Sequence, residues 1–195
     1  MSEIELPHPE ELEEAKAKAF TRHVALTTAI FAVILAITSL GGNNAMKEML
    51  LAQQQASDQW AFYQAKVIRE HFYRGQKMRL ELDLLGKDSL KPAVKQRYEQ
   101  LLRQMAAEEA RYGGEKKEIE KDAKKLEHER DVYRNKDPYF DYAEVLLQIA
   151  IVMASIAILA HSRSVFIFAL VSASLGALLS INGFLMLFRV PFFHY

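Results

Sequence analysis

The chain contains no cysteine and only one tryptophan among its 195 residues. The missing thiols exclude a disulfide scaffold, a thiolate-bound zinc or iron–sulfur site and a cysteine nucleophile. Basic and acidic residues each number 25, so the formal net charge is zero. A nucleic-acid-binding protein usually carries a basic excess or stripe. We therefore predict neither a nucleic-acid partner nor thiol chemistry.

Three long stretches lack Asp, Glu, Lys and Arg: residues 24–46, 145–162 and 164–188. A membrane-spanning helix needs about 20 mainly apolar residues, whereas a helix on a soluble protein carries polar residues along one face. The runs therefore predict three transmembrane helices. Tyr139, Phe140 and Tyr142 lengthen the second run with aromatic side chains, which favour the headgroup level.

The polar segment between the first and second runs is predicted to be helical. Residues 44–85 and 91–136 are rich in strong helix formers and lie on either side of a turn at residues 86–89. Two stretches of similar length joined by one turn predict a long antiparallel helical hairpin. Its second half has a heptad repeat typical of a coiled coil, in which one apolar residue recurs every seven positions: Tyr98, Met105, Tyr112, Ile119, Leu126 and Tyr133.

The rest of the hairpin pattern is less regular. The sequence predicts a polar companion row in the second half: Val94, Leu101, Glu108, Glu115, Asp122 and Glu129. In the first half, the apolar side is expected to change phase before Met78, Leu82 and Leu85. Gly113 and Gly114 predict a weak point or bend. Asp137 is expected to cap the helix that begins near Pro138.

We therefore expect an all-α membrane protein with three transmembrane helices and a coiled-coil-like antiparallel hairpin between the first and second. The expected segments are a polar tail at 1–23, transmembrane helix 1 at 24–42, the extramembrane hairpin at 43–137, transmembrane helix 2 at 138–162, and transmembrane helix 3 with a short tail at 163–195.

Two blocks of sequence suggest a family. One is GGNNA at residues 41–45 followed by QQQASDQWAFYQAKVIREH at residues 53–71, and the other is YFDYAEVLLQIAIVMASIAIL at residues 139–159. Both resemble the bacterial membrane-protein family catalogued as domain of unknown function 4337. The resemblance implies three membrane helices and a charged helical insert, and it brings no catalytic residue or activity.

No catalytic or metal-binding pattern stands out. The six histidines are widely separated, and no pair has the spacing of a zinc-binding HExxH motif. Alternating acids and bases along residues 115–130 are typical of a solvated helix face. Phosphate-binding and serine-hydrolase motifs are absent from the sequence. We predict no enzymatic activity, no cofactor and no metal site.

Two groups of residues are candidates for contacts between chains. Trp60, Phe62 and Tyr63 lie too far beyond the first apolar run to belong to an interfacial aromatic belt. Ser172, Gly176 and Ser180 form a small-residue stripe of the kind that lets membrane helices approach closely. The sequence thus predicts a homo-oligomer that uses both groups.

The expected function is that of an oligomeric integral membrane scaffold or interaction protein, with an unidentified protein partner as a further expectation. The alternative is a small channel or transport-accessory protein whose third membrane helix lines a pore with Ser180 and Asn182.

Basic residues near the apolar runs favour one orientation. Lys16, Lys18, Arg22 and Arg163 place the amino terminus and the turn at residues 161–164 in the cytoplasm. The hairpin would then be periplasmic, in a multi-pass protein of the bacterial inner membrane. The long insert also carries basic residues near the membrane, and counting them removes the preference for this orientation. They are Lys47, Arg130, Arg134 and Lys136.

Overall fold

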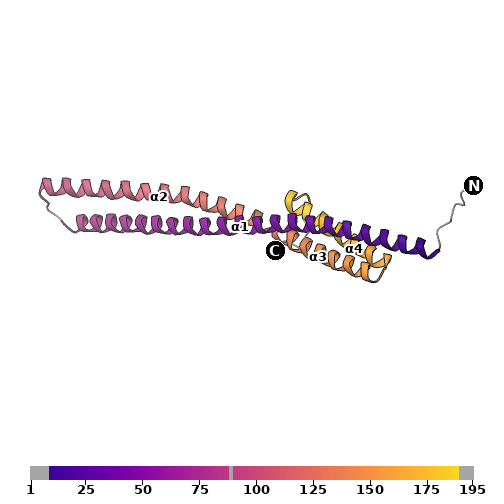
Figure 1. Cartoon of the computed structure of the whole chain (residues 1–195). Helices are drawn as coiled ribbons and strands as arrows, with labels where there is room; N and C mark the ends of the chain where they lie inside the picture. Colours follow the sequence, from indigo (N-terminus) through magenta and orange to yellow (C-terminus); the bar gives the residue numbers. More distant parts are fainter. Residues whose placement is uncertain (1–8, 88–89, 189–195) are drawn as a thin grey trace, which may run out of the picture. The chain divides into compact units, whose positions relative to one another are not determined.

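A computed structural model describes residues 9–87 and 90–188 of the chain. Within this part helices joined by short turns make up the structure, and there is no strand. The helices are α1 (Pro9–Leu85), α2 (Pro92–Arg134), α3 (Asp137–Leu159) and α4 (Arg163–Leu185) (Figure 1). The predicted all-α class is confirmed.

The chain divides into two compact units. Unit 1 combines Met1–Glu48 with Val132–Tyr195, and unit 2 is Met49–Asp131. Unit 1 therefore contains the first part of α1 with α3 and α4, and unit 2 contains the second part of α1 with most of α2.

The helix boundaries follow the local sequence closely. α1 continues through Gly41 and Gly42, and α2 continues through Gly113 and Gly114 without a break. The expected cap at Asp137 is wrong, because Lys136 is the N-cap residue and makes no capping side-chain bond. Asp137 is the first helical residue, and proline in the first turn is tolerated because the early N–H groups have no intrahelical partner.

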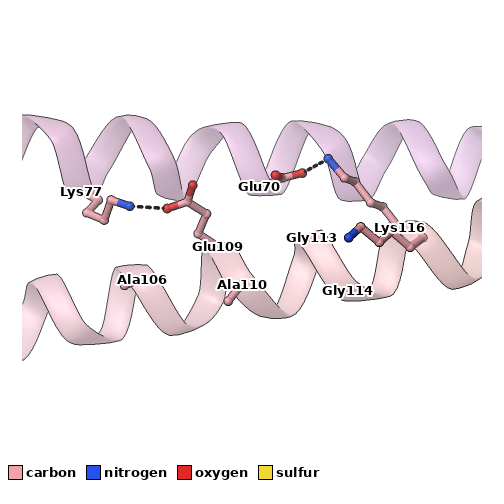
Figure 2. A pocket seen from close by; sticks show the side chains of 9 residues that line it. Glu70, Lys77, Ala106, Glu109, Ala110, Gly113, Gly114 and Lys116 are labelled. Atoms are coloured by element: carbon pink, nitrogen blue, oxygen red, sulfur yellow. Dashed lines mark hydrogen bonds and ion pairs between the residues drawn. The ribbon is translucent and has the colours of Figure 1, made fainter.

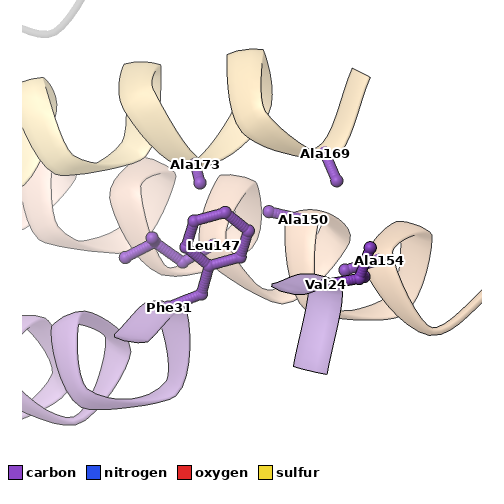
Figure 3. Close-up of a cluster of buried hydrophobic side chains, with 7 residues drawn as sticks. All are labelled: Val24, Phe31, Leu147, Ala150, Ala154, Ala169 and Ala173. Atoms are coloured by element: carbon purple, nitrogen blue, oxygen red, sulfur yellow. The ribbon is translucent and has the colours of Figure 1, made fainter. Parts of the chain in front are cut away.

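The core of unit 1 lies where α1, α3 and α4 meet. Phe31 of α1 and Leu147 of α3 lie among small side chains (Figure 3). The small side chains allow the helix backbones to approach closely. The buried cluster consists of Val24, Phe31, Leu147, Ala150, Ala154, Ala169 and Ala173.

A short turn joins α3 to α4. Ala160 is the C-cap of α3, and Ser162 is the N-cap of α4. Between them His161 has φ 48°, in the left-handed region that few non-glycine residues adopt. The turn expected at residues 161–164 therefore contains one left-handed residue.

By length and composition, three helical stretches of the described chain are long and apolar enough to cross a membrane. They lie within Glu13–Leu85, Pro92–Leu159 and Arg163–Leu185.

Candidate functional site

The two helices of unit 2 contact each other along most of their length. The residue numbers of the α2 partners fall as those of the α1 partners rise, so the helices are antiparallel. Within the unit, hydrogen bonds or ion pairs join Gln53 to Arg130, Trp60 to Glu127, Lys66 to Glu115, Arg74 to Glu109 and Lys87 to Tyr98.

Each helix of unit 2 faces the other with two rows of residues, and within each row the residues are spaced by seven. On α2 one row is the predicted series from Tyr98 to Leu126, all of whose members are buried or partly buried. The second row is Leu102, Glu109, Lys116, Ala123 and Arg130. The predicted companion row is correct only in part. Leu101, Glu108 and Glu115 are partly buried and Glu115 pairs with Lys66 of α1, whereas Val94, Asp122 and Glu129 are exposed.

The rows on α1 run without a change of phase. They are Met49, Ala56, Tyr63, Glu70, Lys77 and Leu84, and Ala52, Gln59, Lys66, Tyr73 and Leu80. Every one of these residues is buried or partly buried, whereas Met78, Leu82 and Leu85 are exposed. The predicted phase shift is therefore wrong. Polar residues on the inward side obscured a heptad pattern that continues to Leu84.

Charged side chains fill the middle of the interface in place of an apolar layer (Figure 2). Glu70, with only 6% of its surface exposed, forms ion pairs with Lys116 and with Arg74, whose Nη2 lies 2.9 Å from Glu70 Oε1. Glu109 accepts hydrogen bonds from Arg74 Nε at 2.7 Å and Lys77 Nζ at 2.6 Å. The network pairs the buried carboxylate of Glu70 and the partly buried carboxylate of Glu109, as burial of charge requires.

These contacts shift the protonation of the carboxylates. The Lys116 hydrogen bond lowers the pKa of Glu70 below its ordinary value of 4.5, although burial opposes the shift. Hydrogen bonds from Lys77 and then Arg74 lower the pKa of Glu109. The Lys66 hydrogen bond likewise lowers the pKa of Glu115.

A groove of about 540 Å³ lies beside this network. Small residues of α2 create the space: Ala106, Ala110, Gly113 and Gly114. On its charged rim Glu70 pairs with Lys116 and Glu109 pairs with Lys77 (Figure 2). Lys117 also lines the groove. Both carboxylates that line the groove are therefore paired with lysines.

The predicted aromatic group divides between two environments. Trp60 is partly buried, donates from Nε1 to Glu127 Oε1 at 3.0 Å, and packs edge to face against Tyr63 at 5.3 Å between ring centroids. Phe62 is 59% exposed. Trp60 and Tyr63 thus contribute to pairing within the chain, and Phe62 alone of the three is available as an outer contact.

Sequence reasoning missed a second apolar row on α1. Ala61, Ala65, Ile68 and Phe72 follow each other at alternating spacings of four and three residues, and all are exposed. Ile68 is 68% exposed and Phe72 is 57% exposed. These heptad positions lie on the side of α1 opposite the rows that contact α2. We call these four residues, with the flanking Phe62, the outer stripe.

A family model described as Domain of unknown function (DUF4337) matches residues 20–186, which is most of the chain. The chain belongs to this family. Neither the curated proteins nor the solved structures yielded a match. Membership of DUF4337 confirms the resemblance drawn from the sequence and leaves the activity to be inferred from this chain.

In this DUF4337 chain, the small residues of α4 contact helices of the same chain. Ser172 Oγ donates to the carbonyl of Leu146 at 2.8 Å. A Cβ on Gly176 would lie 3.0 Å from the carbonyl oxygen of Ala143. Ser180 Oγ accepts a hydrogen bond of 2.8 Å from Thr38. α3 and α1 of the same chain therefore contact the small residues that the sequence assigns to the oligomer interface.

Asn182 is also buried and hydrogen-bonded within the chain. Its side-chain amide donates to the Phe188 carbonyl at 2.8 Å, and its side-chain oxygen accepts from the Phe188 N–H at 2.9 Å. These bonds close the end of α4. The two residues expected to line a pore, Ser180 and Asn182, therefore use their polar groups to join segments of unit 1.

Among residues 9–87 and 90–188, no three His, Asp or Glu side chains are grouped so as to hold a metal ion. The chain offers apolar and charged surfaces, and these carry the inferences that follow.

Proposed function

We propose that this chain is an integral membrane scaffold that spans the bilayer three times, presents the paired helices of unit 2 outside it, and self-associates. The three apolar helical stretches support the spans, since each is long enough to cross a hydrocarbon core about 30 Å thick. The charged surface of unit 2 supports its place in water.

The observation that carries self-association is the outer stripe. A rod of two helices has used one side of α1 to bind α2, yet large apolar side chains remain exposed on the opposite side. Contiguous exposed apolar surface usually marks a contact site. Ala61 and Ala65 let a second helix approach, while Ile68 and Phe72 supply apolar area to bury. This mixture of small and large side chains suits packing against the same stripe of a second copy.

The mass of the purified protein tests this proposal. Light scattering in mild detergent, corrected for bound detergent, should give a multiple of the chain mass. Ile68→Glu should lower that mass, because it would place a charge in the contact. Val94→Glu is the matched control, since it adds the same charge at an exposed apolar residue of α2. A single-chain mass for the unmutated protein would exclude self-association.

The proposed orientation places the amino terminus and the α3–α4 turn in the cytoplasm and unit 2 in the periplasm of a bacterial inner membrane. The basic residues before α1's apolar run and Arg163 support it, by the positive-inside tendency. The channel alternative stays a prediction, and flux through reconstituted liposomes that depends on Asn182 would support it.

A further inference from the structure

One pocket of unit 1 has a basic rim and an apolar wall. It has a volume of about 500 Å³ and lies between the start of α1 and the start of α4. α1 contributes Lys16, Ala19, Phe20 and His23, and α4 contributes Arg163, Phe166 and Ile167. Residues at least 140 positions apart in the sequence thus line one site, since His23 and Arg163 are the nearest pair.

The charge of the pocket has one sign. Lys16, His23 and Arg163 line it, and among residues 13–87 and 90–188, whose side chains the structure describes, no carboxylate does. Within these same residues neither Lys16 nor Arg163 forms an ion pair with an acid, whereas the neighbouring Lys18 pairs with Glu14 at 3.4 Å. The lining is therefore suited to an anion and offers no counter-charge for a ligand ammonium group.

The histidine is oriented by a hydrogen bond. His23 Nδ1 lies 2.6 Å from the carbonyl oxygen of Ala19, so Nδ1 carries the hydrogen and donates. Nε2 is then the ring nitrogen left for a ligand.

The wall of the pocket is apolar and aromatic. Phe20 and Phe166 meet edge to face with ring centroids 6.0 Å apart, and Ile167 is 59% exposed beside them. The charge-free runs begin at Val24 and Ser164, next to the basic rim. If α1 and α4 span the bilayer as proposed, the rim lies at the headgroup level and the wall extends into the hydrocarbon region.

We propose that this pocket binds the phosphate of an anionic glycerophospholipid such as phosphatidylglycerol. Lys16 and Arg163 would contact the phosphate, and an acyl chain would lie along Phe20, Phe166 and Ile167. Basic sites at the ends of membrane helices are suited to acidic headgroups. A choline or ethanolamine lipid fits less well, because its ammonium would find no carboxylate in the lining.

The site rests on the proposed membrane insertion, which a separate measurement tests. The protein should stay in the membrane pellet after alkaline extraction, and so should its Arg163→Gln variant. Release of the unmutated protein would contradict the proposed spans. Retention without selective lipid binding would contradict the pocket alone.

Lipid selectivity is measured on the full chain in a neutral detergent. The lipids tested are phosphatidylglycerol and phosphatidylcholine. Inorganic phosphate serves as the competing anion that lacks acyl chains. Native mass spectrometry should show retention of phosphatidylglycerol in preference to phosphatidylcholine, and inorganic phosphate should not compete at equal concentration. Equal retention of the two lipids would overturn the proposal. Full competition by inorganic phosphate would assign the pocket to a free anion and overturn the lipid assignment.

Matched substitutions locate the site. Lys16→Gln and Arg163→Gln should each weaken phosphatidylglycerol binding about fivefold, the effect of one basic residue near a lipid surface. Lys18→Gln removes the same charge from the same helix outside the pocket and should leave affinity unchanged. Arg163→Lys should retain most of the affinity, and unchanged circular dichroism would verify folding. An equal loss in Lys18→Gln would show that net charge alone attracts the lipid, which would refute the site.

Discussion

Glu70 shows how ion pairing lets a charged side chain occupy a buried position, where an unpaired charge would cost free energy. Its carboxylate lies between Lys116 of α2 and Arg74 of its own helix. A buried ion pair contributes little compared with well-packed apolar residues, yet removing one partner leaves the other charge uncompensated. The pairing therefore specifies which residues of α1 and α2 face each other more than it adds to stability.

This asymmetry gives the first prediction. Glu70→Gln should destabilise unit 2 by about 1–3 kcal/mol, because Lys116 would lose its charged partner. Replacing both Glu70 and Lys116 by leucine should recover most of that loss, since no unpaired charge remains. Trp60 is the only tryptophan of the chain and lies in unit 2, so its fluorescence during urea unfolding reports on this unit. A double variant less stable than Glu70→Gln would contradict this account.

The second prediction concerns pH. The pKa values of Glu70, Glu109 and Glu115 are lowered in the folded state, so the unfolded chain binds protons more readily than the folded chain. The three carboxylates therefore contribute their full stabilisation above pH 4.5, the ordinary pKa of glutamate. This stabilisation is lost as the pH falls through their lower folded-state pKa values. The urea midpoint from Trp60 fluorescence should fall as the pH is lowered from about 5.5 to 3.5. The Glu70/Lys116 double leucine variant should show a smaller fall.

The third prediction contrasts two glycines. A Cβ on Gly176 would lie 3.0 Å from the backbone oxygen of Ala143 and from Leu147 Cγ, whereas a Cβ on Gly114 would meet nothing within 4 Å. Gly176→Ala should cost about 1–3 kcal/mol through overpacking. Gly114→Ala should stabilise α2 by about 0.5–1 kcal/mol, because alanine is the better helix former. Unfolding followed by circular dichroism measures the stability of Gly176→Ala, and unfolding followed by Trp60 fluorescence measures that of Gly114→Ala. Stability changes of the same sign in the two variants would contradict this packing.

At the scale of the element, the sequence predicts helices better than it predicts which faces they bury. The turn near residue 86 and the tyrosine row of α2 were predictable, because glycine, proline and an unbroken apolar repeat are strong local signals. The rows containing Glu70, Lys77, Glu109 and Lys116 were not, since charged residues normally indicate a solvated face. Only the partner helix shows that these charges neutralise each other.

The fourth prediction tests the pairing of the two helices. Two alanines inserted after Met105 should rotate the following part of α2 by about 200°, which would turn Glu109 and Lys116 away from α1. Two residues inserted after Gly86 should be tolerated, because lengthening a turn costs little entropy. Protease resistance of unit 2 distinguishes the two insertions. Equal resistance would mean that the heptad rows do not hold the helices together. Asp88 and Ser89 of the predicted turn lie outside the described residues.

At the scale of the whole molecule, the sequence predicted the order of apolar and polar segments, because unbroken apolar runs need no tertiary information to recognise. It did not predict the pocket between α1 and α4. In the sequence Lys16 and Arg163 bear only on orientation, since residues so distant from each other give no sign that they line one site. The outer stripe was detectable in principle from the spacing of Ala61, Ala65, Ile68 and Phe72.

The last prediction tests the proposed spans and their orientation together. Because the chain has no cysteine, single cysteines can report on each side of the membrane. We choose Val94→Cys in unit 2 and Ser164→Cys at the start of α4, both at exposed positions. In spheroplasts of a bacterial host, an impermeant thiol reagent should label Val94→Cys at once and Ser164→Cys only after lysis.

The two cysteines also distinguish the ways in which this proposal can fail. Only α3 lies between unit 2 and Ser164, so a spanning α3 requires the two sites to be on opposite sides. The reverse labelling pattern would keep the spans and invert the orientation, which would show that Lys47, Arg130, Arg134 and Lys136 outweigh the basic residues of the amino-terminal segment. Labelling of both cysteines before lysis would show that α3 does not cross the bilayer, and the three-span architecture would have to be abandoned.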